Sequence, residues 1–226
     1  MSEPELTLYL GGTRSGKSAA AEAHALRNGG PVLYVATAMP QPDDPAMSER
    51  IRRHRLRRPD SWRLLECPRR LAPAVAAAWE EMRSAAPGGR QATILVDCVT
   101  LWVTNLLLSL PEQEDAGALE CLVTEEISAL IDLSRALPCR WVIVSGETGL
   151  GGIGGNALSR QFCDGLGLAN QFLAARAQEA FLVVAGRLLR LAPAEELLPP
   201  VCTLTAWRTA ETACWWRPPR PGGWRS

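Results

Sequence analysis

The sequence predicts an α/β fold in which a mostly parallel β-sheet carries helices on both faces. Short apolar runs alternate with longer stretches rich in Ala and Leu, from about residue 6 to residue 191. A glycine-rich loop at residues 11–18 joins the first apolar run to the first helical stretch. Strands that alternate with helices in this way are typical of parallel sheets. We therefore expect one domain built on such a sheet.

The individual elements follow from local patterns. The expected strands are, in chain order, residues 6–10 (LTLYL), 32–36 (VLYVA), 62–66 (WRLLE), 93–97 (TILVD), 141–145 (WVIVS) and 181–185 (FLVVA). The expected helices are residues 17–28, 46–57, 70–86, 100–109, 115–136 and 156–178. Pro87 and Pro138 stand just beyond two of these helices, where a stop signal is expected. A last short run, 187–191, is expected to pair back on the strand before it as an antiparallel edge hairpin.

Composition narrows the class of protein. Hydrophobic residues make up 47% of the 226 residues, and the formal net charge is +0, so no overall field favours nucleic acid or a membrane. No apolar run reaches the roughly 18–20 residues that cross a bilayer, and the N-terminus lacks a secretory pattern. The seven cysteines form no Cys-x-x-Cys pair, which fits a reducing cytoplasm, and two histidines exclude a histidine-rich metal centre.

The last part of the chain differs from the rest in composition and in hydrophobic periodicity. No linker interrupts residues 5–191, so we expect a single domain over 1–191. Residues 192–226 are rich in Pro, Gly, Arg and Trp and have little periodicity. This segment is expected to be a poorly ordered tail. The alternative is that it packs on a neighbouring subunit.

The glycine-rich loop has the pattern of a P-loop, Gly-x-x-x-x-Gly-Lys-Ser/Thr. Its glycines let the backbone wrap around a phosphate, with N–H groups pointing inward and a helix N-terminus beside them. Lys17 is expected on the β- and γ-phosphate oxygens, and the Ser18 hydroxyl on Mg²⁺. A strand before the loop and an Ala-rich helix after it support this interpretation. The sequence therefore predicts that the chain binds a nucleoside triphosphate.

A P-loop site also needs an acid at the C-terminal end of a neighbouring strand to hold Mg²⁺. Asp97 ends the apolar run TILVD and is the candidate. Its alternative role is the N-cap of the helix that begins near Thr100.

Six arginines and one histidine stand together at residues 50–58. A run of charges is most often a solvated helix face, and a second possibility is a helix that contacts RNA or DNA. The third is a phosphate-handling arm, because arginine binds phosphate oxygens in bidentate fashion and neutral imidazole is a competent nucleophile. Nearby cations disfavour the imidazolium form of His54.

Further motifs along the chain have the residues and the spacing that are typical of one known family. Residues 11–22 read Gly-Gly-x-Arg-Ser-Gly-Lys-Ser-x-x-Ala-Glu, and the second strand runs into Tyr34-Val35-Ala36-Thr37-Ala38. Then come Met47, Arg50-Ile51, His54, Arg58-Pro59, Trp62, Glu66 and Asp97-Cys98-x-Thr100-x-Trp102-x-x-Asn105-Leu106-Leu107. The late block holds Glu147-x-Gly149-x-Gly151, Arg160-x-Phe162-x-Asp164, Gly167 and Asn170-Gln171.

Over roughly residues 6–190 these motifs resemble the bifunctional adenosylcobinamide kinase/adenosylcobinamide-phosphate guanylyltransferase family of cobalamin biosynthesis. The chain departs from the family pattern at Ala46, where an acid is usual before the Met. The family's late block commonly opens with Asn-Glu and runs into Val-Pro, whereas this chain has Gly146-Glu147 followed by the glycine-rich residues 151–155. The tail after residue 192 has no counterpart in the family pattern. The resemblance implies a RecA-like P-loop NTPase fold and a homotrimer. It also implies two reactions: phosphorylation of adenosylcobinamide by ATP or GTP, and transfer of GMP from GTP through a GMP-histidine to the cobinamide phosphate.

The resemblance also assigns roles to residues. It implies His54 and Lys17 as catalytic residues, with Ser18 and Asp97 on Mg²⁺. The nucleotide contacts that it implies are Gly11, Gly12, Thr13, Arg14, Ser15, Gly16, Lys17, Ser18, Thr37, Ala38, Met39, Arg55, Leu56, Arg57, Arg58, Glu66 and Asp97. The corrin-binding residues leave no short motif.

Two rival functions remain open at this point. One is a P-loop small-molecule kinase or ATPase with a single activity, in which His54 only belongs to a basic face. The other is a nucleotide-gated RNA-binding module, which balanced charge and the lack of aromatics in residues 46–58 disfavour. We expect no nucleic-acid partner and no transmembrane segment.

Overall fold

The described residues form a seven-stranded sheet whose order is β3-β2-β4-β5-β1-β6-β7. All neighbouring strands are parallel except β6 and β7, which form an antiparallel pair at one edge. The strands are β1 (Leu6–Gly11), β2 (Val32–Ala36), β3 (Arg63–Glu66), β4 (Thr93–Asp97), β5 (Arg140–Gly146), β6 (Glu179–Val184) and β7 (Arg187–Leu191). The predicted mostly parallel sheet with an antiparallel edge hairpin is confirmed.

This computed structural model describes residues 5–39, 49, 51–52, 55–56, 58–85, 91–111, 117–152 and 154–193. All the described helices and strands lie in one compact unit, Met1–Ala192. Most of the predicted helix 46–57 lies outside the described residues, although residues 49, 51–52 and 55–56 are helical. Almost all of the tail at 192–226 lies outside them too, so its predicted disorder stays a prediction.

The helices agree with the sequence pattern to within a few residues. They are α1 (Lys17–Asn28), α3 (Leu71–Ala85), α4 (Val99–Leu107), α5 (Ala118–Ala136) and α6 (Ala157–Arg176), with a 3-10 turn, η1 (Gly149–Gly151). Asn156 caps α6, because its Oδ1 accepts a hydrogen bond from Ser159 N at 2.7 Å. None of the described helices has the length and apolarity needed to cross a bilayer.

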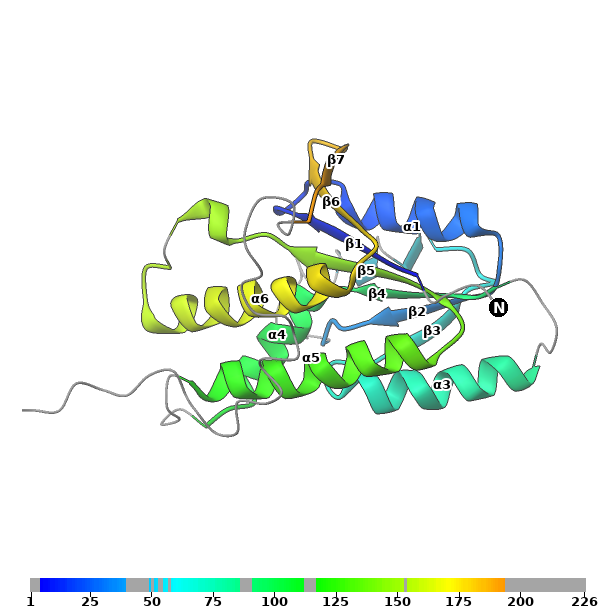
Figure 1. Cartoon of the computed structure of the whole chain (residues 1–226), viewed down its shortest axis with the longest axis horizontal. Helices are drawn as coiled ribbons and strands as arrows, with labels where there is room; N and C mark the ends of the chain where they lie inside the picture. Colours follow the sequence, from blue (N-terminus) through cyan, green and yellow to red (C-terminus); the bar gives the residue numbers. More distant parts are fainter. Residues whose placement is uncertain are drawn as a thin grey trace, which may run out of the picture. The chain divides into compact units, whose positions relative to one another are not determined.

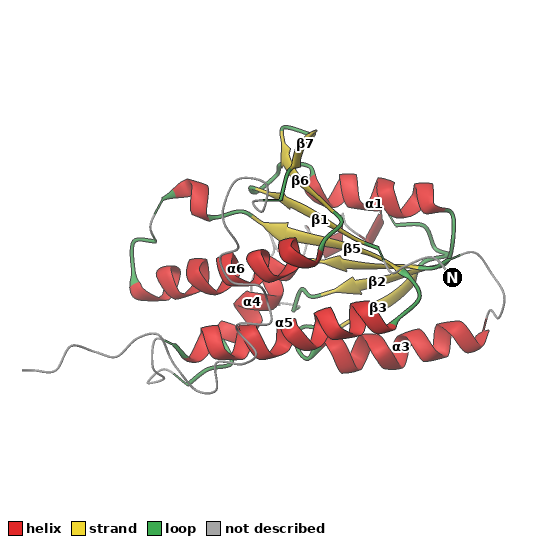
Figure 2. Ribbon diagram, in the orientation of Figure 1, coloured by secondary structure: helices red, strands yellow, loops and turns green. Residues whose placement is uncertain are grey.

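Helices cover both faces of the sheet (Figures 1 and 2). On one face, Ala21 and Ala25 of α1 pack against alternate strand residues that include Tyr9, Tyr34 and Leu95. The intervening strand residues, which point to the other face, are equally buried, and α3, α4, α5 and α6 pack together there. Burial on both faces explains why the strands read as continuous apolar runs.

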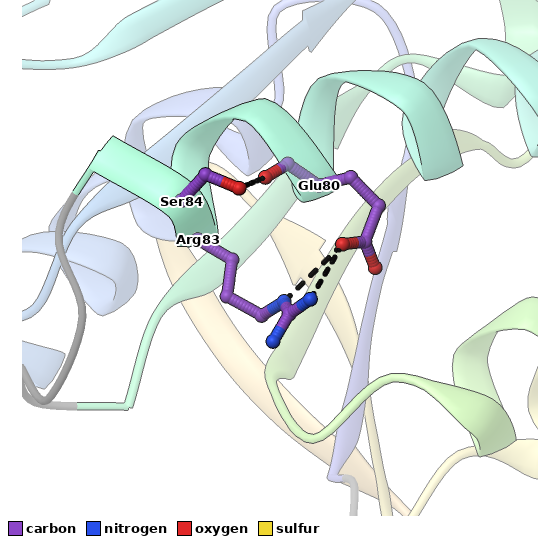
Figure 3. A network of polar contacts seen from close by, with 3 residues as sticks. All are labelled: Glu80, Arg83 and Ser84. Carbon is purple, nitrogen blue, oxygen red and sulfur yellow. Dashed lines mark hydrogen bonds and ion pairs between the residues drawn. The ribbon is translucent and has the colours of Figure 1, made fainter.

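The outer surface of α3 shows what a solvated helix face looks like in this chain. Arg83 donates to Glu80 Oε2 from Nε at 3.3 Å and from Nη2 at 2.8 Å, and Ser84 Oγ donates to the Glu80 carbonyl at 2.8 Å (Figure 3). Both charged side chains are more than half exposed. A pair of this kind stabilises a helix by only about 0.3–0.5 kcal/mol, so the fold rests on the buried face.

Candidate functional site

The loop between β1 and α1 lies at the C-terminal edge of the parallel strands, and its backbone is curled. Arg14 (φ 58) and Gly16 (φ 98) both adopt left-handed conformations on either side of Ser15. Such alternation turns successive N–H groups toward one side and makes a concave site for an anion. Gly16 is also the N-cap residue of α1, so the positive end of the helix dipole adds to this site.

Two polar side chains of the loop lie within its curl. Lys17 is buried, and its Nζ donates to the Gly12 carbonyl at 3.1 Å. The Ser15 hydroxyl is buried and has no hydrogen-bond partner among the described residues. Gly12, Thr13 and Arg14 are exposed. The loop therefore brings backbone donors and an ammonium group together in one place, as a bound polyphosphate requires.

Asp97 lies beside the start of α1, as the sequence predicts. Ser18 Oγ donates to Asp97 Oδ1 at 3.2 Å, and Tyr34 OH donates to Asp97 Oδ2 at 2.7 Å. The alternative role of Asp97 as a helix cap is wrong, because α4 begins after Cys98 as its N-cap residue. The carboxylate is thus held by one hydroxyl on each of its oxygens.

The strand that carries Asp97 is not the direct neighbour of the P-loop strand. β5 lies between β1 and β4, with Gly11 opposite Gly146 and Asp97 opposite Val144. The prediction of a neighbouring strand was therefore wrong in this detail. Ser18 still reaches Asp97, because α1 packs across β1, β5 and β4.

Tyr34 is a site residue that the motifs did not assign. Burial, and then the adjacent Asp97 carboxylate, raise the pKa of its hydroxyl far above the ordinary value of 10. It therefore stays protonated and remains a donor to Asp97. The Arg58 guanidinium carbon lies 4.2 Å above the Tyr34 ring, and Trp62 stacks beside it at 6.2 Å between centroids. This cation–π contact brings one arginine of the 50–58 cluster to the site.

A second arginine of the cluster also lies at this edge of the sheet. Arg55 Nη2 donates to Glu66 Oε1 at 2.5 Å, and both side chains are about half exposed. Ala36 of β2 is paired with both Glu66 of β3 and Asp97 of β4, so the two acids end their strands at the same level. His54 and Arg57 lie outside the described residues, and their predicted roles stay predictions.

The residues after β2 and in the arginine segment differ in exposure. Thr37 is fully buried, and its hydroxyl contacts both the N–H (2.8 Å) and the carbonyl (2.7 Å) of Cys98. Its hydroxyl is thus engaged within the protein. Ala38 is partly exposed, while Met39 and Leu56 are 45% and 71% exposed. The predicted nucleotide contacts of these four residues stay predictions.

The end of β5 is fixed by side chains that the sequence analysis left without a role. Gly146 N donates to Thr100 Oγ1 at 2.6 Å, and the Gly146 carbonyl accepts from Asn170 Nδ2 at 2.9 Å. Glu147 N then donates to the Gly11 carbonyl at 3.1 Å. α4 and α6 therefore fix the strand beside the P-loop. Only the spacing of the family motif signals these residues, because nothing local distinguishes them.

The oxygen ligands at the site fit a hard divalent cation. Ser18 and Asp97 offer a hydroxyl and a carboxylate at hydrogen-bond distance from each other, and Mg²⁺ is commonly held by one or two protein groups together with phosphate oxygens and water. Within the described ranges no three His, Cys, Asp or Glu side chains gather as a dedicated metal site.

Comparisons with known proteins agree with this geometry. Residues 7–191 match the family model described as cobinamide kinase/cobinamide phosphate guanyltransferase. The chain is 44% identical over 179 residues to the bifunctional adenosylcobalamin biosynthesis protein CobP of Pseudomonas aeruginosa, covering 79% of this chain and 92% of that protein. It is 40% identical over 186 residues to CobU of Salmonella typhimurium, covering 80% and 96%.

The fold is also similar to that of a solved ATPase domain. The ATPase domain of G40P superposes with a TM-score of 0.50 at 12% identity, over 80% of this chain and 70% of that one. At such low identity the likeness shows the fold alone, and it agrees with the predicted α/β fold. The match over residues 7–191 decides the family: the chain belongs to the cobinamide kinase/cobinamide phosphate guanyltransferase family of bifunctional transferases.

Proposed function

We propose that this chain phosphorylates adenosylcobinamide on its aminopropanol hydroxyl with ATP or GTP, and then transfers GMP from GTP to the product. The final product is adenosyl-GDP-cobinamide. The observation that carries the proposal is the family match over residues 7–191, a range that spans the P-loop, the arginine segment and Asp97. The contact between Ser18 and Asp97 beneath the loop supports it.

The kinase step uses the P-loop. The inward N–H groups of residues 11–18 hold the phosphates, and Lys17 offsets the negative charge that spreads over the transferred phosphoryl group. Ser18 and Asp97 would hold Mg²⁺, which would neutralise negative charge on the phosphates when bound. The aminopropanol oxygen forms a bond to the γ-phosphorus and its proton is released to water, while the bond to the β–γ bridging oxygen breaks and the nucleoside diphosphate leaves.

The guanylyl step uses His54. Its neutral imidazole attacks the α-phosphorus of GTP, pyrophosphate leaves, and the GMP then passes from the imidazole to a phosphate oxygen of the cobinamide phosphate. Arg55, Arg57 and Arg58 offset charge on the phosphates. The described contacts of Arg55 with Glu66 and of Arg58 with Tyr34 support this, because they bring residues that flank His54 to the edge of the sheet that carries Asp97.

The remaining nucleotide contacts are assigned on the family motif. They are Gly11, Gly12, Thr13, Arg14, Ser15, Gly16, Thr37, Ala38, Met39, Leu56 and Glu66. Met39 and Leu56 are exposed and can cover a bound base, whereas Glu66 must exchange its ion pair with Arg55 for a contact to guanine.

The assembly and location are also part of the proposal. We propose a homotrimer in the cytoplasm. Val184 and Leu189 of the edge hairpin are 60% and 61% exposed, which favours a subunit contact there. Cys67, Cys98, Cys121, Cys139 and Cys163 are all free thiols, as a reducing compartment favours. Light scattering of the purified protein tests the trimer.

One labelling experiment tests the two activities. The protein is incubated with Mg²⁺ and α-labelled GTP, and a chain-bound label that is labile in acid and stable in base indicates a phosphoramidate. In parallel, γ-labelled ATP is supplied with adenosylcobinamide, and label should appear in the corrinoid. Label in the corrinoid without any label on the protein would favour the single-activity kinase instead.

His54→Ala should abolish the GMP adduct and the guanylyl transfer while it spares much of the kinase step. Phosphorylation of a hydroxyl needs the P-loop and a positioned acceptor, but no protein phosphoramidate. His24→Ala is the matched control, because His24, on α1, is the other histidine of the chain and contacts Tyr9 of β1. A His54→Ala protein that still carries the GMP label would remove His54 from the mechanism.

A further inference from the structure

The edge hairpin closes with a turn whose backbone is unusual. Val184 of β6 pairs with Arg187 of β7, so the turn consists of two residues, Ala185 and Gly186. Their φ angles are 49° and 75°, both in the left-handed region. Two left-handed residues make the type I′ turn that suits a two-residue hairpin. Alanine disfavours this conformation, so the turn is held in place by something beyond its own preference.

That turn packs directly on the P-loop. Gly186 N donates a hydrogen bond to the Ser15 carbonyl at 2.8 Å. A Cβ on Gly16 would lie 3.2 Å from the Gly186 Cα, and a Cβ on Gly11 would lie 2.6 Å from the Val183 carbonyl. Both glycines of the P-loop motif therefore lie against the hairpin, one at each end of the loop.

The hydrogen bond from Gly186 determines how one peptide of the P-loop is turned. A peptide unit is planar and trans, so its C=O and N–H point in opposite directions. The Ser15 carbonyl and the Gly16 N–H belong to one peptide unit. Because Gly186 holds the carbonyl on the hairpin side, the Gly16 N–H points away from the hairpin, toward the side where the loop must meet a phosphate.

We propose that the Ala185–Gly186 turn is a positioning device for the P-loop, which orients the Gly16 N–H for phosphate binding. The inference rests on the proposed nucleotide site. It adds that the β6–β7 hairpin, which lies outside residues 11–18, helps to orient the phosphate-binding loop. The turn acts through the Ser15–Gly16 peptide and touches no substrate.

A matched pair of glycine substitutions tests this. Gly186→Val places a branched side chain at φ 75° and displaces the turn. Gly29→Val does the same at φ 66°, at the C-cap of α1, the end of the helix opposite the P-loop. Both variants should lose thermal stability to a similar degree. Only Gly186→Val should raise the Kd for Mg-GDP, by about tenfold or more, measured by calorimetry well below either Tm.

A second substitution keeps the turn and removes its strain. Asn tolerates the left-handed region, and Asn-Gly is the preferred pair for a type I′ turn. Ala185→Asn should therefore raise Tm and leave the Kd for Mg-GDP unchanged or lower. If Gly186→Val does not fold, Gly186→Ala takes its place and should also raise the Kd for Mg-GDP. A Cβ at residue 186 meets no atom within 4 Å, so this substitution strains only the backbone.

The outcomes separate this inference from the proposed function. Wild-type protein that does not bind Mg-GDP contradicts the nucleotide site itself. Wild-type protein that binds Mg-GDP, with Gly186 variants that bind it equally well, shows that the turn is only structural. Equal weakening by Gly29→Val would attribute the effect to general destabilisation and would likewise overturn the inference.

Discussion

At the scale of single residues, the site depends on how the Asp97 carboxylate is held. Each of its oxygens accepts one hydroxyl hydrogen bond, from Ser18 and from Tyr34. The Arg58 guanidinium lies over the Tyr34 ring. The carboxylate is therefore oriented before any cation binds, and orientation of a metal ligand by a neighbouring group commonly changes metal affinity by 10- to 100-fold.

Tyr34→Phe should weaken the apparent Mg²⁺ affinity of the kinase reaction by about tenfold, because one donor that orients Asp97 is lost. The measurement is the initial rate as a function of Mg²⁺ at saturating nucleotide. Tyr9→Phe is the control. Tyr9 is the other tyrosine of the chain, and its hydroxyl contacts His24 instead of Asp97. An unchanged Mg²⁺ dependence in Tyr34→Phe would show that the hydrogen bond does not matter for the cation.

Lys17→Ala should lower both reaction rates by at least about 100-fold, because one preorganised charge in a transition state contributes about 3 kcal/mol. Lys17→Arg tests whether charge alone suffices at this buried position. Lys17 is the single lysine of the sequence, so modification of its amine can be followed by mass without interference from other lysines. Nucleotide should protect it; near wild-type rates in Lys17→Ala would separate the P-loop from the chemistry.

At the scale of elements, α6 anchors the end of β5 next to the P-loop. Asn170 lies on the buried face of α6, where it donates to the Gly146 carbonyl and accepts from Ser145 Oγ at 2.5 Å. Thr100 of α4 holds the N–H of the same glycine. Contacts from these two helices thus fix the end of β5. Glu147 comes directly after β5, and its N–H donates a hydrogen bond to the Gly11 carbonyl.

Asn170→Ala should lower the free energy of unfolding by about 1–3 kcal/mol, because it leaves a buried carbonyl and a buried hydroxyl without their partners. Urea denaturation measures the change. Gln171→Ala, at the next position and exposed, is the control and should change stability by less than about 0.5 kcal/mol. Equal effects of the two substitutions would mean that Asn170 contributes only helix propensity.

At the scale of the whole molecule, the family match and the predicted domain end at the same residue. Residues 7–191 carry the family pattern, and all the described helices and strands lie within Met1–Ala192. The tail that follows has a composition that does not favour a packed core.

Deletion of residues 195–226 should leave a folded protein with both activities, because every recognised motif precedes the deletion. Circular dichroism, thermal unfolding, light scattering and the two labelling assays measure the result. Insolubility of the shortened chain, or a change in its oligomeric state, would show that the tryptophans of the tail are packed.

The sequence by itself determined the α/β class, the positions of nearly all described strands and helices, the glycine-rich loop and the place of Asp97 at the end of its strand. These features depend on residues close together in the chain, where hydrophobic periodicity, glycine placement and motif spacing act directly. Of the predicted helix 46–57, residues 49, 51–52 and 55–56 are helical and the others lie outside the described residues, so most of this helix stays a prediction.

Only the tertiary structure decided which strands are neighbours and which side chains meet. β5 lies between β1 and β4 although it follows both in the chain. The Tyr34 hydroxyl donates to the carboxylate of Asp97, which lies 63 positions away in the chain. The Gly186 N–H, in the hairpin at the sheet edge, donates to the Ser15 carbonyl. Local patterns specify how each segment folds and which face it buries. Long-range contacts depend instead on how all the segments pack together. Each strand can pair with several partners, and the helices and loop lengths select one order among them.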